Sequence, residues 1–361
     1  MFPENSITRL AIIASLSLTI LTASCHQNND AANVAKPLSN ASQNSKLKTA
    51  MEAVEPFFTP MGKPQTGDWL ASHPESGQTF EEYINSNPNV PTSDRRTIYV
   101  LPLGKFSPIQ QKIIAETQEY MQAFFGLPIK MLPQRSLPAT ITSGDFRMKG
   151  YPSRRQIRAG FIMDKILKPA IPKDAAALIA FTNEDLFPDE SMNYVFGQAS
   201  LEDRVGIWSL ARLGEKIDQT TFLKRTMKIA VHETAHMFGF KHCTKYECVM
   251  SGTNSLAETD RRPIDACPEC MAKICWMTHT KPEERYEKLA AFCRKYGLAK
   301  EADEFKNKAA AVRIGKHSTY QYLACIAFRS NLSPLQPHMP VKGLYSEFHQ
   351  QQSHRARARR M

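Results

Sequence analysis

The chain of 361 residues lacks two features that would assign it to common classes of protein. Its N-terminal apolar run, Leu10 to Ala23, is fourteen residues long and interrupted by Ser and Thr, which is too short and too weak for a membrane-spanning helix. The formal net charge is +11, but no aromatic interleaving and no reading helix accompany the basic residues. We therefore expect no nucleic-acid partner, and the basic C-terminal tail is more typical of a solvated, disordered segment than of one that binds anionic lipid or nucleic acid.

The N-terminus is typical of an exported protein. Arg9 precedes the apolar run, which has the length of a signal-peptide core and ends Leu-Thr-Ala-Ser-Cys at Cys25. This ending resembles a bacterial lipobox, in which Cys25 would be lipidated and would anchor the chain to a membrane. The sequence therefore predicts an exported, membrane-anchored lipoprotein, with a cytoplasmic location as the alternative. Residues 26–54 begin with a stretch rich in Asn, Ser, Ala and Gln, which predicts a flexible tether.

The most informative segment is HETAHMFGFKHC, from His232 to Cys243. On a helix, His232 and His236 project from one face, one turn apart, as two zinc ligands must. Glu233 lies about a hundred degrees further round, where it can take a proton from zinc-bound water. Gly239 can adopt positive φ and end the helix in a sharp turn, which lets His242 approach the same metal. Three nitrogen ligands leave a fourth position open, which is the catalytic pattern.

A purely structural interpretation is weaker. A bare HExxH occurs by chance in about one chain per hundred of this length, and the further Gly and His lower that by about three orders of magnitude. The apolar residues around the motif also predict an ordinary buried helix, which is compatible with metal binding. Two other functions stay open: a zinc-binding protein without activity, and an interaction scaffold that uses the cysteines and the basic tail. The intact Glu233 favours the enzyme.

A second metal signal follows at once. Cys243 and Cys248 form one pair, Cys267 and Cys270 form a CxxC pair, and eighteen residues separate the pairs. This spacing is within the range of a structural zinc ribbon with four cysteine ligands, so the sequence predicts two zinc ions per chain. Two disulfides are the alternative, because exported thiols are exposed to oxidation. Met250 follows His242 by eight residues and resembles the methionine turn below the zinc of metzincin proteases.

The combined pattern, HExxHxxGxxHC followed by Cys248, Met250 and the CxxC pair, resembles the archaemetzincin family. The similarity covers about residues 55–305 and includes three further stretches: GDWLASHPESGQTFEEY (67–83), FTNEDLFPDESMNYVFGQAS (181–200) and RYEKLAAFCRKYGL (285–298). The resemblance implies a zinc-dependent peptidase that acts on a peptide or protein substrate. It implies that His232, His236 and His242 bind the catalytic zinc, that Glu233 is the general base, and that the four cysteines hold a structural zinc. A cysteine-switch propeptide is not expected, because residues 26–95 contain no cysteine.

The fold class is expected to be α/β, with a metzincin-like mixed sheet, an active-site helix, the zinc ribbon and C-terminal helices. Apolar patterning predicts strands at 97–103, 127–132, 175–182, 194–199 and 204–210, and helices at 108–125 and 154–167. By resemblance, the strand near 193–200 is the place for an extended substrate to pair, with an ordinary interior strand as the alternative. Asp185 is expected to cap a loop. The catalytic domain is expected to span 55–280, with C-terminal helices at 281–313, broken near Gly297, and the basic tail at 314–361.

Overall fold

A computed structural model describes residues 40–139, 141–149, 153–214 and 217–330, with side chains up to residue 315. The predicted signal peptide and Cys25 lie outside these residues. The central element is a five-stranded sheet with the order β2-β1-β5-β8-β7, in which the first four strands are parallel and β7 is antiparallel to β8. The strands are β1 (Thr97–Leu103), β2 (Ile129–Met131), β5 (Ala175–Thr182), β7 (Gly197–Ala199) and β8 (Val205–Ser209). The predicted mixed sheet is confirmed, and β7 forms one edge of it.

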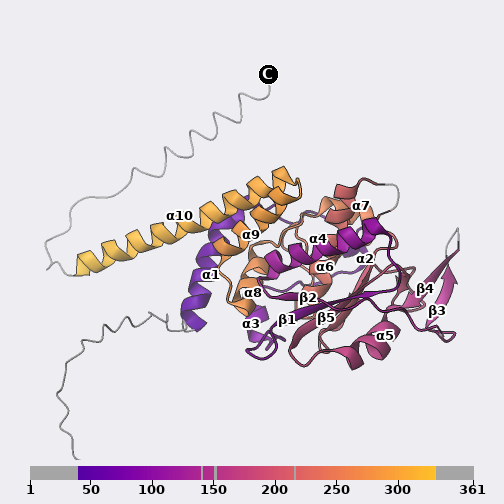
Figure 1. The fold of residues 1–361 in the computed structure, drawn as a ribbon. Coiled ribbons are helices and arrows are strands. Elements are labelled where there is room, and N and C mark those ends of the chain that lie inside the picture. The colour runs from indigo at the N-terminus through magenta and orange to yellow at the C-terminus, as the bar shows by residue number, and fades with distance from the viewer. Residues whose placement is uncertain (1–39, 140, 150–152, 215–216, 331–361) are drawn as a thin grey trace, which may run out of the picture. The chain divides into compact units, whose positions relative to one another are not determined.

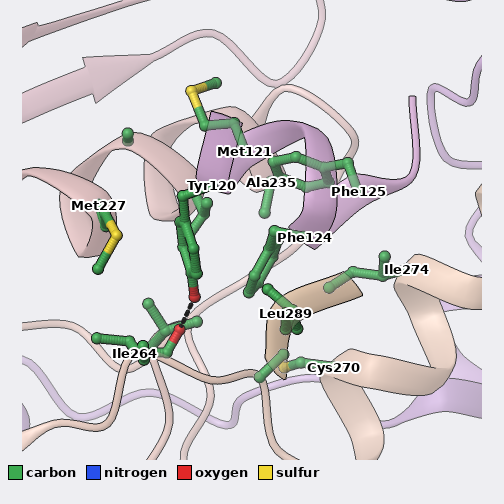
Figure 2. Packing of buried hydrophobic residues seen from close by; sticks show 14 of the residues in the cluster. Tyr120, Met121, Phe124, Phe125, Met227, Ala235, Ile264, Cys270, Ile274 and Leu289 are labelled. Carbon is green, nitrogen blue, oxygen red and sulfur yellow. Dashed lines mark hydrogen bonds between the residues drawn. The ribbon is translucent and has the colours of Figure 1, made fainter. Parts of the chain in front are cut away.

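Both faces of this sheet are buried, so its central strands are apolar throughout rather than alternating. In β1, Ile98 and Val100 belong to one core and Tyr99 and Leu101 to the other. The first core also takes in α4 (Pro108–Phe125) and α6 (Gln219–His236), which pack against each other. Figure 2 shows α4 in this core, where the hydroxyl of Tyr120 donates a hydrogen bond to the carbonyl of Ile264. The helix α6 also packs against β7 and β8 of the sheet.

The second core lies under a smaller sheet with the order β3-β4-β6, formed by β3 (Phe146–Lys149), β4 (Arg154–Arg158) and β6 (Asp185–Phe187). The predicted helix over 154–167 is wrong in its first five residues, which form β4. A short helix, α5 (Ala159–Ile162), and a π-helical turn (Met163–Leu167) follow. The burial of Ile157 and Ile162 is compatible with one continuous helix and also with a strand followed by a helix. Residues 154–158 form a strand because they pair with β3 and β6.

Helices from both ends of the described chain pack together beside the sheet: α1 (Asn40–Val54), α8 (Pro268–Thr278), α9 (Pro282–Lys295) and α10 (Ala299–Ser330) (Figure 1). The structure differs here from the predicted tether, because residues 40–54 form a helix that contacts α8 and α10. Leu47, Ala50 and Val54 are buried along one side of α1. The predicted break near Gly297 is confirmed, with φ of 73° at this residue.

The predicted tail also begins later than expected, since α10 continues as a helix to Ser330. Gly315, which directly follows the predicted boundary, lies within this helix, and neither proline nor a further glycine interrupts residues 316–330. The remaining described helices are short: a 3₁₀ turn (Glu55–Phe57), α2 (Trp69–Ser72), α3 (Phe80–Asn85), a 3₁₀ turn (Lys168–Ala170) and α7 (Leu256–Arg261). Within the described part of the chain, no helix combines the length and the apolar character that a membrane crossing requires.

Candidate active site and metal centres

The helix α6 carries the first part of the motif. Asp218 caps its N-terminus by accepting a hydrogen bond from the backbone N–H of Thr221 at 3.0 Å. The helix ends at His236, and Gly239 then adopts φ of 80°, as the sequence predicts. A side chain at Gly239 would be strained in this conformation and would also press on Pro88, at 3.2 Å. The turn reverses the chain and brings His242 back to the end of the helix.

Three histidine nitrogens converge beyond the end of α6. One ring nitrogen each of His232, His236 and His242 lies within 4.8 Å of the others. The Nε2 atoms of His232 and His236 are 3.0 Å apart. Nitrogen ligands about 2.0–2.1 Å from one zinc ion, at tetrahedral angles, would lie roughly 3.4 Å from one another. The arrangement is therefore close to that of a preformed three-histidine site.

Each histidine is oriented through its other ring nitrogen. The Nδ1 atom of His232 lies 2.9 Å from the carbonyl oxygen of Val249, and that of His236 lies 2.7 Å from the carbonyl oxygen of Phe240. The Nδ1 atom of His242 lies 2.9 and 3.0 Å from the carboxylate oxygens of Glu75. Carbonyl and carboxylate oxygens only accept hydrogen bonds, so Nδ1 carries the proton in all three rings. The Nε2 lone pairs are then left for a metal.

The electrostatics of the cluster fit a cation. Burial and the neighbouring histidines lower the pKa of His232 well below its ordinary value, and burial likewise lowers the pKa of His236 to about 4. Both rings are therefore neutral near pH 7. With the protons on Nδ1, two Nε2 lone pairs face each other at 3.0 Å without a hydrogen between them. A metal ion held by these three histidines would remove this repulsion, which is the strongest sign that the residues fit one.

Glu233 lies beside the histidines and is 8% exposed. Without a cation beside it, burial raises the pKa of its carboxyl group to about 8. A metal ion at the three histidines would lower this pKa again, because a nearby positive charge favours the carboxylate. Gly197, in the edge strand β7, packs directly against this side chain: a Cβ atom at Gly197 would lie 2.6 to 2.8 Å from the Cγ, Cδ and Oε1 atoms of Glu233. The absence of a side chain at Gly197 therefore makes room for Glu233 between the helix and the sheet.

The four predicted cysteines also come together. Cys243 and Cys248 lie in the loop after the histidines, Cys267 directly precedes α8 and Cys270 lies in its first turn. All four Sγ atoms lie within 4.8 Å of one another, and none of these cysteines forms a disulfide. The Sγ atoms of Cys243 and Cys267 are 3.5 Å apart, far beyond the roughly 2.05 Å of a disulfide and near the roughly 3.8 Å between thiolates on one tetrahedral zinc.

The cysteine cluster is tied to the histidine cluster by short stretches of backbone. Cys243 directly follows His242, and its N–H donates to the carbonyl oxygen of Met250 at 2.8 Å. The N–H groups of Met250 and Cys267 point at the Sγ atom of Cys248, at 3.4 and 3.2 Å. Met250 is fully buried. A metal held by the cysteines would therefore fix the loop that supplies both His242 and the Val249 carbonyl.

Two residues near the site were missed by the sequence analysis. Glu75 accepts from His242 and from the indole N–H of Trp69 at 2.8 Å, and the Trp69 ring packs edge-on against His242 at 5.5 Å between centroids. Both residues lie in the 67–83 stretch that resembles the family, but no spacing rule links them to the histidines.

The predicted role of Asp185 as a loop cap is wrong. Asp185 is buried in β6 and forms an ion pair with Arg212 at 2.6 Å.

A cleft of about 730 Å³ joins these groups. The three histidines and Glu233 line it, together with all of β7. On one side the segment 188–201 contributes mainly apolar and aromatic residues, and on another the segment 249–262 contributes polar ones. Trp69 and Glu75 complete the wall next to His242. The cleft is large enough for several residues of an extended peptide, and the three histidines line the same space as the edge strand β7.

Comparisons with known proteins identify the family of the chain. A sequence model of peptidase family M54 matches residues 96–275. Human archaemetzincin-2 is 34% identical over 286 residues, which cover 69% of this chain and 78% of that protein. Human archaemetzincin-1 is 26% identical over 260 residues, covering 62% and 51% of the two chains. A solved archaemetzincin from Methanopyrus kandleri is 26% identical and covers 50% of this chain and 94% of its own, with a TM-score of 0.41. The chain belongs to peptidase family M54, the archaemetzincins, and is a zinc metallopeptidase.

Proposed function

We propose that His232, His236 and His242 bind the catalytic zinc and that Glu233 is the general base of peptide hydrolysis. The observation that carries this proposal is the convergence of three histidines whose Nδ1 atoms are all committed to oxygen acceptors. When bound, zinc supplies a Lewis acid that polarises the scissile carbonyl and acidifies water. Glu233 takes the proton of the attacking water and then delivers it to the leaving amine. Gly197 leaves the space that Glu233 needs to do so.

The peptide substrate is proposed to pair with the free edge of β7. In the β7–β8 ladder, the carbonyl of Phe196 accepts from Ser209 and the N–H of Ser200 donates to Val205. Because bonded residues alternate in an antiparallel pair, the backbone groups of Gly197 and Ala199 point away from β8. β7 ends the sheet within the described residues and lines the cleft. These groups are therefore available to hold an extended peptide by backbone hydrogen bonds, next to Glu233.

We further propose that a second zinc ion binds to Cys243, Cys248, Cys267 and Cys270. The four sulfur atoms lie at distances that suit tetrahedral coordination, and two backbone N–H groups point at one of them. The N-terminus of α8, where Cys267 and Cys270 lie, favours negatively charged thiolates. Four protein ligands leave no open position, so this ion would be structural.

Metal analysis of the full chain tests both sites. The expected content is two zinc ions per chain in the wild type and one in each of the variants His236→Ala and Cys270→Ser. The His236→Ala protein should lose peptide cleavage. Cys275→Ser, at a buried cysteine outside the cluster, is the matched control and should keep both ions. A wild-type protein with one zinc and two disulfides would overturn the structural site, and one without zinc would overturn both.

The localisation is also a proposal: an exported lipoprotein anchored through Cys25. It rests on the N-terminal sequence, in which a signal-like apolar run ends at this cysteine. The test is expression of the full chain in a bacterium that processes lipoproteins, with labelled fatty acid. Label and membrane association should both disappear in Cys25→Ser and persist in Ser24→Ala. Unlabelled wild-type chain in the soluble cytoplasmic fraction would contradict the proposal.

A further inference from the structure

One wall of the active-site cleft carries a buried lysine that the reaction does not use. Lys228 lies on α6 one turn before His232, so the two side chains project from the same face of the helix. Both residues line the cleft, and Lys228 is only 6% exposed. One turn of helix spans about 5.4 Å, which is within reach of the side chain of a substrate residue next to the scissile bond.

Lys228 is held by neutral groups. Its ammonium donates to the carbonyl oxygens of Thr259, at 2.9 Å, and Asp260, at 3.3 Å, near the C-terminal end of α7. Among the described residues, no carboxylate lies within ion-pair distance of its Nζ atom. An ammonium group has three N–H donors, so at least one is not used by these carbonyls.

The charged residues around Lys228 are paired with one another. Lys224 binds Glu301, and Arg225 binds Asp260 through two hydrogen bonds of 2.8 and 2.6 Å. Arg262, which lines the same wall, forms ion pairs with Glu247 and Glu258. Lys228 is therefore the cation of this group that has no anionic partner. Burial lowers the pKa of Lys228 to about 8, since the more distant charges of Asp260 and Glu301 offset only part of the desolvation.

The rest of this wall suits a polar ligand. Ser251, Thr253, Asn254 and Thr259 line the cleft beside Lys228 and Arg262, and all come from the segment that follows the Cys248–Met250 loop. Arg262 adds positive charge to this wall, although its guanidinium is paired with Glu247 and Glu258. An ammonium without an anionic partner, among hydroxyl and amide groups, suits an anion better than an apolar side chain.

We propose that this wall, formed by Lys228 and the segment 251–262, is a substrate subsite for a carboxylate, so that the peptidase prefers peptides with an acidic group beside the scissile bond. The carboxylate can be an Asp or Glu side chain, or the free C-terminus of a short substrate. The inference rests on the proposed active site, because it takes the metal position and β7 as the frame in which the peptide lies. A peptide carboxylate would supply the anion that the fold does not provide to Lys228.

The test compares matched peptides that differ only in Glu or Gln at each position around the cleavage site, each with a free or an amidated C-terminus. For the zinc-loaded wild type we expect a Glu-to-Gln ratio in kcat/KM of about tenfold to a hundredfold at one position, the range of a charge-assisted hydrogen bond. If kcat/KM depends instead on whether the C-terminus of the peptide is free or amidated, the bound carboxylate is the C-terminus of the peptide. A ratio near one at every position, with or without amidation, would overturn the subsite.

Lys228→Met keeps the length of the side chain and removes its charge, and we expect it to reduce the ratio to about one. Lys228→Arg should keep a preference for the acid. Lys224→Met is the matched control, one turn earlier on the same helix, and should leave the ratio unchanged. A preference that survives unchanged in Lys228→Met would contradict the proposal. Failure of the active-site proposal can be told apart from failure of the subsite proposal, because neither the Glu peptides nor the Gln peptides would then be cleaved. If Lys228→Met does not fold, the wild-type ratio still decides.

Discussion

The carboxylate of Glu75 accepts a hydrogen bond from Nδ1 of His242 at 2.9 Å, across 167 residues of sequence. Glu75 lies before the region that matches the family model, residues 96–275, whereas His242 lies within it. The 67–83 stretch therefore contributes to the candidate site: Glu75 orients His242, and Trp69 in turn donates to Glu75. A carboxylate on a ligating histidine fixes the ring and raises its basicity toward the metal.

We expect Glu75→Gln to lower the affinity for the catalytic zinc about 10- to 100-fold, because the amide keeps an acceptor but loses the charge. Competition with a calibrated zinc chelator measures the affinity. Glu81→Gln, at an exposed residue paired with Lys48, is the control and should change little. Equal zinc affinities in the wild type and Glu75→Gln would show that the carboxylate does not support the ligand.

Gly197→Ala should lower kcat about 100-fold while leaving zinc bound, because its Cβ would displace the Glu233 carboxylate. Steady-state kinetics and metal analysis of the same preparation separate the two effects. Gly62→Ala is the control, since a Cβ at Gly62 meets nothing within 4 Å. Wild-type kcat in Gly197→Ala would contradict the close packing of β7 on Glu233.

The C-terminal helices are joined to the core by a buried ion cluster. Asp265 accepts from Lys308 at 2.9 Å and from Arg285 at 3.3 Å, and its carbonyl oxygen accepts from the N–H of Val249 at 3.0 Å. Val249 in turn accepts from His232. The cluster therefore connects α9 and α10 to the backbone that orients a candidate metal ligand.

Asp265→Asn leaves two buried cations without their carboxylate and should destabilise the fold by about 3–5 kcal/mol. Urea unfolding measures the free energy. The matched control is Glu119→Gln, which removes the exposed partner of Lys295 and should cost no more than about 1 kcal/mol. Similar losses in the two variants would mean that the buried cluster contributes no more than a surface pair.

Stability should rise with pH above 8 because of Lys228. Burial lowers its folded-state pKa to about 8 from the ordinary 10.5, so the unfolded chain binds the proton more tightly. The penalty is fully present below pH 8 and disappears above about pH 10.5. Between pH 8 and pH 10, wild type should gain about 2 kcal/mol in unfolding free energy relative to Lys228→Met. Parallel pH profiles of the two proteins would show that Lys228 is not desolvated.

The parts of this molecule that depend on local pattern could be predicted. The helix at 108–125 and the strands at 97–103 and 175–182 match the structure. A strong helical period or a continuous apolar run is compatible with one type of secondary structure at these positions. The histidines and cysteines are brought together as their spacing predicts, since helix and loop geometry relates each to the next.

The parts that depend on distant contacts could not be predicted. Glu75 meets His242 only in the folded chain. Asp185 is buried because Arg212 supplies its counter-charge, and a single acidic residue after a strand does not reveal that partner. The polar composition of residues 40–54 does not indicate the helix that they form, because only a few apolar residues pack on α8 and α10. A lysine on a helix is ordinarily solvated, and Lys228 is buried because the C-terminal end of α7 covers it.

Glu233 is proposed to transfer protons next to a zinc ion held by three histidines. The most direct measurement is peptide-library cleavage by the full chain and by Glu233→Gln, with zinc content determined on the same samples and with Glu119→Gln as the control. We expect Glu233→Gln to keep its zinc and to lose cleavage by at least about 100-fold, within the usual range for removal of a general base. Full cleavage by zinc-loaded Glu233→Gln would contradict the account.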